Sequence, residues 1–374
     1  MSFMSKHSIM DVPRYFVPYT NDCFQNAYGS LISYFKLNPD LLLSDYLSFV
    51  YNPEAGFAGI NYLHKEAASV EFTEEELNVS QEYIYYPSTT YFSRRGEQSS
   101  KVIANDKLKI TWYIDDDQDI AYSRMKELID NDMPVVVVVD LYYIRYHKAY
   151  QKEHGLHAIV ITGYNEEENY VELFDKYKFS NCDFDGRIPA DELMKARSSE
   201  NCSNKITRPI RNLWMEFDGN RQFVYSEKRW RGVIEESCRR MHGEKELLGC
   251  KSGFKSIEAF RKDLLEKKNQ SIDQEFNELF RNYYSAVFRS LSRGRNRFAA
   301  FLNALDSELP QELITGVTNL LKESAKAWEI NANLSIRLAI TKNMNGIDNL
   351  SEQLIAICNY EGKAVEMLHK FICE

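Results

Sequence analysis

The sequence predicts an α+β chain, in which a part that contains a β-sheet is followed by a part made only of helices. Residues 135–139 are consecutive valines, the pattern of a strand that is buried on both faces. Residues 157–164 and 170–175 are two further runs rich in β-forming residues. From residue 227 onward, apolar side chains recur at helical spacing. We therefore expect two domains, residues 1–226 and residues 227–374.

The first predicted helix covers residues 23–35, where apolar side chains recur at helical spacing. Thr20, Asn21 and Asp22 precede it, and all three are good N-cap residues. Cys23 therefore lies at or within the first turn. A helix N-terminus stabilises a thiolate relative to the neutral thiol, which makes Cys23 the candidate nucleophile of the chain.

Four further elements are predicted between this helix and the valine run. Residues 37–51 have the spacing of a second helix, and residues 52–59 form a Gly-containing loop that either lines a substrate cleft or simply connects two elements. Residues 108–114 alternate as in a strand, and the acidic residues 115–119 cap the helix that follows. The acidic run also resembles the start of a calcium loop. A cap is expected instead, because the required Gly is absent and Lys126 stands where the bidentate Glu belongs.

The second and third β-rich runs are separated by a short acidic segment, which predicts an antiparallel hairpin. Paired residue numbers in such a hairpin have a constant sum. A turn centred on Glu166 places His157 opposite Asp175, whereas a turn centred on Glu167 places His157 opposite Tyr177 with Asp175 diagonal to it. Both sums are even, so His157 and Asp175 share one face of the sheet in either register. An imidazole beside a carboxylate is two-thirds of a nucleophilic triad.

The remaining elements follow from the same patterns. The sequence after Asp175 is polar and irregular through residue 203, and residues 213–225 suggest another hairpin around an Asp-Gly-Asn turn. The helices of the C-terminal part include residues 272–291, 313–328 and 347–372, the last with a break at residues 359–362.

Cys23, His157 and Asp175 together resemble the papain-like cysteine peptidase fold, in which a Cys opens an N-terminal helix, a His starts a downstream strand and an Asp ends the next strand. The pair Asp22-Cys23 and the runs MPVVVVVDLYYI and HAIVITGY more closely resemble two relatives of that fold. These are the peptidases that process bacteriocin leaders, and the acyltransferase of butirosin biosynthesis with its homologues. The resemblance covers residues 12–180. It implies a papain-like domain, with an N-terminal helix packed on an antiparallel sheet, followed by an all-α domain.

The resemblance to the butirosin-type acyltransferase implies an enzyme that forms an amide bond in secondary-metabolite biosynthesis. Cys23 would take an acyl group from a carrier-protein thioester and pass it to a small amine. His157 would act as general base, and Asp175 would orient the imidazole. The implied partners are an acyl or peptidyl carrier protein and the amine. No cofactor is expected beyond the phosphopantetheine arm that carries the acyl donor.

Two alternatives stay open. One is a cytoplasmic cysteine peptidase or amidase, in which water resolves the acyl-enzyme. The other is a binding module without catalytic activity on the same scaffold. Leader peptidases are fused to exporters, and no apolar run in this chain approaches the roughly 18 residues of a membrane-spanning helix, which favours the transferase.

The oxyanion donor is not evident from the sequence. Papain-like peptidases carry a Gln a few residues before the Cys, and residues 16–21 contain none. Asn21, Tyr19 or the backbone N–H of Cys23 are the candidates that replace it.

Other clusters of reactive side chains carry weaker signals. His147, His154 and His157 lie near Asp140, but their spacing matches no familiar metal-ligand motif, so no metal is expected. A basic cluster is either a receptor for a phosphopantetheine phosphate or acidic carrier protein, or a solvated helix junction. It consists of Arg289, Arg293, Arg295 and Arg297. The cysteines other than Cys23 have no catalytic context and are expected to be structural. They are Cys182, Cys202, Cys238, Cys250, Cys358 and Cys373.

Composition bounds the class of protein. The chain has 374 residues, of which 44% are apolar, enough for a sizeable core. A net charge of -9 argues against nucleic acid as a partner. The N-terminus lacks the apolar segment of a secretion signal, and seven cysteines without a CxxC pair indicate neither a disulfide framework nor a zinc module. We therefore expect a cytoplasmic protein with no membrane partner.

Overall fold

The structure is a computed structural model. It describes residues 5–43, 46–53, 57–59, 90–94, 108–178, 181–201, 209–217, 225–247, 250–269 and 273–374.

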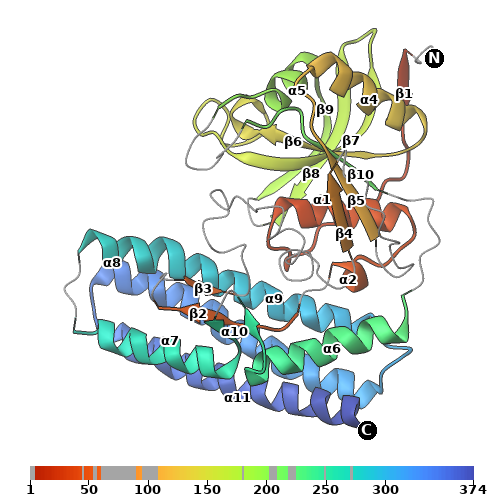
Figure 1. Ribbon diagram of the computed structural model, residues 1–374. Coiled ribbons are helices and arrows are strands. Elements are labelled where there is room, and N and C mark those ends of the chain that lie inside the picture. Colours follow the sequence, from red (N-terminus) through yellow and green to blue (C-terminus); the bar gives the residue numbers. More distant parts are fainter. Residues whose placement is uncertain are drawn as a thin grey trace. The chain divides into compact units, whose positions relative to one another are not determined.

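The described residues form two compact units (Figure 1). The first comprises the described parts of residues 1–43 and 89–224, and the second those of residues 44–88 and 225–374. The sequence analysis placed all of residues 1–226 in one domain. In the structure, residues 46–53 and 57–59 pack with the helical unit instead.

The first unit is built on one mixed sheet, in which every neighbouring pair of strands is antiparallel except β4 and β5. The short strand β1 adds to the turn end of β7. In sheet order the strands are β4 (Thr90–Arg94), β5 (Leu108–Tyr113), β10 (Trp214–Phe217), β6 (Val135–Asp140), β7 (Leu156–Asn165), β8 (Tyr170–Tyr177) and β9 (Cys182–Pro189), with β1 (Lys6–Ser8) beside β7. This sheet and the helical C-terminal region confirm the α+β class, whereas the papain-like fold stays a prediction.

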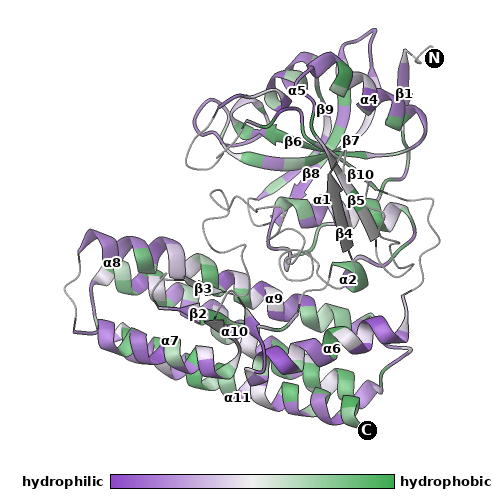
Figure 2. Cartoon of the chain, in the orientation of Figure 1, coloured by the Kyte–Doolittle hydropathy of each residue, from purple (hydrophilic) through white to green (hydrophobic). Residues whose placement is uncertain are grey.

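Strand β6 is the centre of this sheet, between β10 and β7. All five of its valines are fully buried, as the unbroken valine run predicted. Figure 2 shows hydrophobic residues along this strand and the adjoining part of β7. The strand that carries His157 therefore pairs with the most buried strand of the unit.

Among the described residues, four α-helices belong to the first unit, and three of them pack on the sheet (Figure 1). Helix α1 packs on β7 and β8, and α5 packs on β6, β8 and β9. Asp117 caps α4 by accepting the backbone N–H groups of Asp119 and Ile120, which confirms the predicted acidic cap. The helices are α1 (Cys23–Tyr34), α2 (Pro39–Leu42), α4 (Gln118–Asp130) and α5 (Ala190–Arg197).

Two predictions about this part of the chain were wrong. The predicted second helix is the single turn α2, and β2 (Val50–Asn52) pairs with β3 (Phe57–Gly59) where the helix was expected to end. The segment after Asp175, predicted to be irregular, forms β9 and α5. Strand β9 was missed because acidic and basic residues occupy its exposed face and only alternate positions are apolar.

The second unit is a bundle of helices. Figure 2 shows hydrophilic and hydrophobic residues interspersed along its long helices, as expected of helices with one buried face. Helix α11 runs without interruption through residues 359–362, so the predicted break there was wrong. The helices are α6 (Glu227–His242), α7 (Phe254–Lys267), α8 (Gln274–Glu278), η4 (Leu279–Tyr284), α9 (Ser285–Asn303), α10 (Gln311–Thr341) and α11 (Gly346–Cys373), with the short strands β11 (Glu246–Leu247) and β12 (Cys250–Lys251) between α6 and α7.

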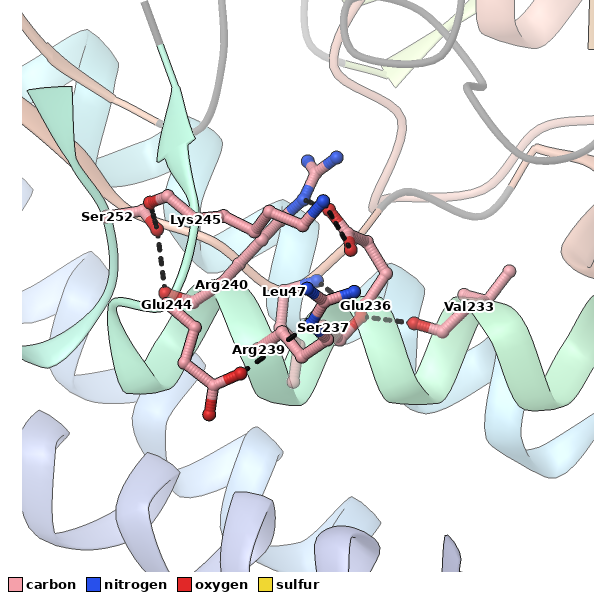
Figure 3. A network of polar contacts seen from close by, with 9 residues as sticks. All are labelled: Leu47, Val233, Glu236, Ser237, Arg239, Arg240, Glu244, Lys245 and Ser252. Carbon is pink, nitrogen blue, oxygen red and sulfur yellow. Dashed lines mark hydrogen bonds and ion pairs between the residues drawn. The ribbon is translucent and has the colours of Figure 1, made fainter. Parts of the chain in front are cut away.

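Residues 46–53 belong to this unit because their side chains and backbone are satisfied there. Phe49 stacks on Trp328 of α10, with ring centroids 5.8 Å apart. The Leu47 backbone N–H donates to Oγ of Ser237 at 3.1 Å, and that hydroxyl donates to the carbonyl of Val233 at 2.7 Å (Figure 3). The buried aromatic ring and the paired backbone groups therefore place residues 46–53 in the helical unit, although the described residues before them in the sequence belong to the first unit.

Two arginines of the predicted basic cluster, Arg295 and Arg297, are buried and so do not serve as a receptor for phosphate. The guanidinium of Arg295 is buried and makes two hydrogen bonds to the buried carboxylate of Glu361, at 2.7 and 2.9 Å. A third bond joins it to the backbone carbonyl of Ser48 at 3.1 Å. Arg297 is also buried. Neither alternative holds for Arg295, because a buried, charge-paired arginine is neither solvated nor available to a ligand.

Among the described residues, no helix is both long and apolar enough to cross a membrane.

Candidate active site

Cys23 is the first residue of α1, as predicted. Asp22 caps the helix, accepting the backbone N–H of Gln25 at 2.8 Å. The thiol is buried, with 8% of the residue exposed. The backbone N–H of Ala158, at the start of β7, points at Sγ of Cys23 over 3.3 Å. The sulfur thus lies at the positive end of a helix and accepts an N–H group, a setting in which nucleophilic cysteines occur.

His157 and Asp175 are paired at the open end of the hairpin formed by β7 and β8. Nε2 of His157 lies 2.8 Å from Oδ1 of Asp175, and the two side chains are only 4% and 2% exposed. Because Nε2 is bonded to the carboxylate, Nδ1 is the imidazole nitrogen left for the thiol of Cys23. The structure therefore brings together the three residues that the sequence analysis selected.

The hairpin has the predicted antiparallel pairing, but its register changes along its length. Towards the open end Ile161 pairs with Leu173, which is the register of a turn centred on Glu167. Towards the turn Gly163 pairs with Glu172, so the sum of the paired numbers is odd there. The expectation of one constant, even sum was wrong for the turn half of the hairpin.

The change of register is a β-bulge at Thr162, the residue that the pairing passes over. Without this bulge, if Thr162 paired regularly, the odd register set at the turn would continue to the open end. His157 and Asp175 would then point to opposite faces of the sheet. The bulge restores the even register, and the predicted common face of His157 and Asp175 is confirmed by their contact.

Electrostatic interactions raise the pKa of His157 and lower the pKa of Asp175. Burial lowers the pKa of His157, but the Asp175 carboxylate and then the Cys23 side chain raise it by more, so the pKa stands well above its ordinary value. Burial raises the pKa of Asp175, but the imidazolium of His157 and three hydrogen bonds lower it by more, so the carboxyl is ionised. At neutral pH the site therefore holds a cationic imidazole between a carboxylate and a thiol, the arrangement that stabilises a thiolate.

The second oxygen of Asp175 is held by two donors that the sequence analysis did not identify. Oδ2 accepts the hydroxyl of Tyr146 at 3.2 Å and the thiol of Cys182 at 3.0 Å. The Tyr146 ring stacks on Phe184, with centroids 3.8 Å apart and planes 4° from parallel. Phe184 pairs with Asp175 across β8 and β9, which puts Cys182 diagonal to Asp175. Recognising β9 by its alternating apolar positions would have revealed Cys182.

The loop between β6 and β7 delivers Tyr146 to the site, and its base is closed by the buried Asp140. Oδ1 of Asp140 accepts the backbone N–H groups of Tyr142 and Gly155, each at 3.1 Å. Oδ2 lies 2.7 Å from Nδ1 of His154 and accepts the hydroxyl of Ser199 at 2.8 Å. Asp140 and His154 are thus engaged in fixing the loop. Within the described ranges, no cluster of three or more His, Cys, Asp or Glu residues could hold a metal ion.

Two of the proposed oxyanion donors, the Tyr19 hydroxyl and the Asn21 backbone N–H, have other partners. The hydroxyl of Tyr19 donates to Oδ1 of Asp40 at 3.0 Å. The backbone N–H of Asn21 donates to Oε1 of Gln25 at 2.7 Å, and its carbonyl accepts the hydroxyl of Tyr177 at 2.9 Å. These contacts shape the entrance to α1.

Comparison with known families supports the sequence analysis. Residues 22–176 match the family model of butirosin biosynthesis protein H, N-terminal region, which confirms the resemblance to that family. The match begins at the N-cap of α1 and ends one residue after Asp175, so it spans the three residues described above. The comparison with curated proteins gave no significant match.

Proposed function

We propose that this protein is a cysteine-dependent acyltransferase. It forms an amide bond in secondary-metabolite biosynthesis by moving an acyl group from a carrier-protein thioester to an amine. The observation that carries the proposal is the Cys23 thiol at the N-terminus of α1, beside an imidazole that is bonded to Asp175 at 2.8 Å. The family matched by residues 22–176 is named for the biosynthesis of butirosin, which favours a biosynthetic reaction over protein turnover.

In the first step the Cys23 thiolate attacks the carbonyl carbon of the thioester. A carbon–sulfur bond forms to Cys23 as the bond to the carrier sulfur breaks. The imidazolium of His157 gives its proton to the departing carrier thiolate, so the products are an acyl-enzyme, a carrier thiol and a neutral imidazole. Asp175 holds the imidazole in the orientation that this transfer needs.

In the second step the amine attacks the acyl-enzyme. The bond between carbon and nitrogen forms, and the proton of the amine passes to His157. Cys23 leaves as a thiolate, which restores the ion pair with the imidazolium and completes one turnover. A thioester suits this site because a thiolate departs readily and needs little assistance from an acid.

The test is intact mass spectrometry of the protein after incubation with acyl-N-acetylcysteamine or acyl-phosphopantetheine thioesters, with and without primary amines. We expect an acyl adduct on the wild-type protein that an amine discharges faster than water does. Cys23→Ala should form no adduct. Cys238→Ala is the matched control, since Cys238 is also buried but lies in α6 and donates to the Val365 carbonyl, so it should form the same adduct as the wild type.

Other outcomes would point elsewhere. An adduct that water removes as fast as an amine does would identify a hydrolase. If no thioester forms an adduct, and Cys23 reacts with iodoacetamide no faster than a free thiol, the protein would be a binding module rather than an enzyme.

A further inference from the structure

One nitrogen of His147 is a buried hydrogen-bond donor without a partner. His147 lies in the loop between β6 and β7 and is 7% exposed. Its Nδ1 accepts the backbone N–H of Ala149 at 3.1 Å, which fixes the proton of the neutral ring on Nε2. Nε2 is itself buried, and no atom of the described residues accepts its proton. Buried donors in folded proteins almost always have an acceptor, so this one calls for a ligand.

The ring that carries this donor lies near the candidate catalytic imidazole. The rings of His147 and His157 are 5.9 Å apart, centroid to centroid. The residue before His147 is Tyr146, whose hydroxyl is bonded to Asp175. The loop that presents both residues is closed at its base by Asp140. The loop that carries the His147 donor is therefore fixed at its base.

The two imidazoles are in different protonation states. Burial, followed by the positive charge of His157, lowers the pKa of His147. His147 therefore stays neutral while His157 is a cation. A neutral imidazole N–H that faces a reacting centre acts as an electrophile, because it donates a hydrogen bond to a developing negative charge without giving up its proton.

We propose that the Nε2–H group of His147 donates to the carbonyl oxygen of the acyl group as the Cys23 thiolate attacks it. This inference rests on the proposed acyl-transfer function and adds a side-chain oxyanion donor to the remaining candidate, the backbone N–H of Cys23. The sequence has no Gln before Cys23, and the Tyr19 hydroxyl and the Asn21 backbone N–H donate to other acceptors. In this step the negative charge moves from sulfur to the carbonyl oxygen, and the proton stays on Nε2.

The experiment compares two reactions of the same thiol. Iodoacetamide alkylates the Cys23 thiolate by displacement of iodide, without forming an oxyanion. p-Nitrophenyl acetate acylates it through a tetrahedral intermediate whose oxygen is negatively charged. The reactivity of the thiolate affects both rates and cancels in their ratio. The ratio of the acylation rate to the alkylation rate therefore reports the oxyanion donor. His147→Phe removes the donor and keeps a ring, whereas His147→Gln keeps an N–H donor.

We expect His147→Phe to lower this ratio by about 10²-fold to 10³-fold, as the loss of one oxyanion-hole donor does elsewhere. Alkylation should stay within about twofold of the wild-type rate. His147→Gln should recover part of the ratio, and it tests the proposal by itself if the Phe variant does not fold. Tyr150→Phe is the control in the same loop, since the Tyr150 hydroxyl accepts the side-chain amide of the exposed Gln151 and takes no part in closing the loop base, and it should leave the ratio unchanged.

Three results would overturn the inference. The first is a ratio that His147→Phe leaves unchanged. This result would arise if neither rate changes, or if both rates fall together because His147 only positions His157. The second is a ratio that His147→Gln lowers as far as His147→Phe does. The third is a wild-type protein that is alkylated at Cys23 but is not acylated by the ester. If the ratio falls as expected and no carrier thioester yields an amide, the proposed transferase function fails while this assignment stands.

Discussion

The imidazole of His157 donates through Nε2 to Oδ1 of Asp175, 2.8 Å away across the open end of β7 and β8. Among the described residues the carboxylate is bonded to His157, Tyr146 and Cys182 but not to the Cys23 thiol, so it acts on Cys23 through the imidazole. It raises the pKa of His157 despite burial and leaves Nδ1 as the nitrogen that faces the sulfur. This indirect action can be separated experimentally from the chemistry of the thiol itself.

Asp175→Asn removes the charge that raises the pKa of His157 and keeps the shape of the side chain. The pKa of the imidazole then falls, and the imidazolium that stabilises the thiolate is lost at a lower pH. We expect the alkaline limb of the pH profile for acylation of Cys23, a step that uses the imidazolium as proton donor, to move to lower pH. Acylation at neutral pH should fall by about 10²-fold or more, since the orienting carboxylate of a serine triad accounts for about 10⁴-fold in kcat. A profile that does not move would contradict the assignment of Asp175.

The same pair makes folding stability depend on pH. The pKa of Asp175 is lowered in the folded state, so its contribution to the free energy of unfolding is present above its unfolded pKa and is lost as pH falls through the folded pKa. The pKa of His157 is raised, so its contribution is lost as pH rises through its folded pKa. Denaturant unfolding of wild type and Asp175→Asn should therefore differ most between these limits, by about 3–5 kcal/mol. A difference that is constant from acid to alkaline pH would show that the pair is not ionised.

Part of this site follows from the sequence because its signals are local. The N-cap before Cys23, the valine run and the alternation in the next two strands each depend on neighbouring residues. The bulge at Thr162 does not, since it is fixed by how β7 meets β1 and β8 at the same time. The sequence analysis reached the right face for His157 only because it assumed an even register, which the bulge restores.

Contacts between residues that are far apart in the sequence explain the other wrong predictions. Arg295 is buried because Glu361, far along the chain, supplies its counter-charge, and no local pattern reveals such a pairing. Phe49 lies with the helical unit because its ring fits against Trp328. Cys182 has no catalytic pattern around it, and its contact with Asp175 depends on the register of β9.

Tyr146 positions Asp175, and loss of its hydroxyl should change the pH profile differently from a general disruption of the loop. Tyr146→Phe keeps the stack on Phe184 and removes one hydrogen bond to Oδ2. The charge of the carboxylate is then shared among fewer donors, so the pKa of His157 should rise and the alkaline limb of the acylation profile should move to higher pH. Acylation should fall by roughly tenfold, as expected for one hydrogen bond to a charged group. A limb that moves to lower pH would indicate a damaged His157–Asp175 pair instead. Tyr150→Phe, in the same loop, is the control.

Cys182 should behave as a protonated thiol throughout these experiments. Burial, followed by the charge of Asp175, raises its pKa far above the ordinary value. Iodoacetamide at neutral pH should therefore label Cys23 and leave Cys182 unmodified, as peptide mapping by mass spectrometry would show. Labelling of Cys182 at a rate near that of Cys23 would mean that its proton is not held by Asp175.

The buried pair of Arg295 and Glu361 should dominate the stability of the helical unit. Glu361 also accepts the Ser324 hydroxyl at 2.6 Å and the Trp328 indole N–H at 3.0 Å. Glu361→Gln leaves a buried guanidinium without a counter-charge, and we expect a loss of about 3–5 kcal/mol in denaturant unfolding. The double variant Arg295→Met/Glu361→Leu removes both charges and should be less destabilised than Glu361→Gln. Equal destabilisation of the two variants would show that packing, not the unpaired charge, accounts for the loss.

Substitution of Gly163 and of Gly362 by alanine should change the free energy of unfolding in opposite directions. A Cβ at Gly163, beside the bulge, would lie 2.9 Å from the backbone carbonyl oxygen of His7 and 3.1 Å from Cα of Ser8, so β1 would have to move. A Cβ at Gly362, inside α11, would meet no atom within 4 Å. Gly163→Ala should therefore lower the free energy of unfolding by about 1–3 kcal/mol through overpacking. Gly362→Ala should raise it by about 0.5–1 kcal/mol, because alanine restricts the unfolded chain and favours the helix.

Thermal unfolding measures both changes, and a shift of about 2–4 °C in Tm for each kcal/mol is expected for units of this size. Gly232→Ala in α6 is a second control, since a Cβ there also meets no atom within 4 Å. If Gly163→Ala raises Tm as the two helical variants do, β1 does not pair with β7 in solution. The bulge at Thr162 would then be set by the turn and by β8 alone, and shortening β1 should leave the labelling rate of Cys23 unchanged.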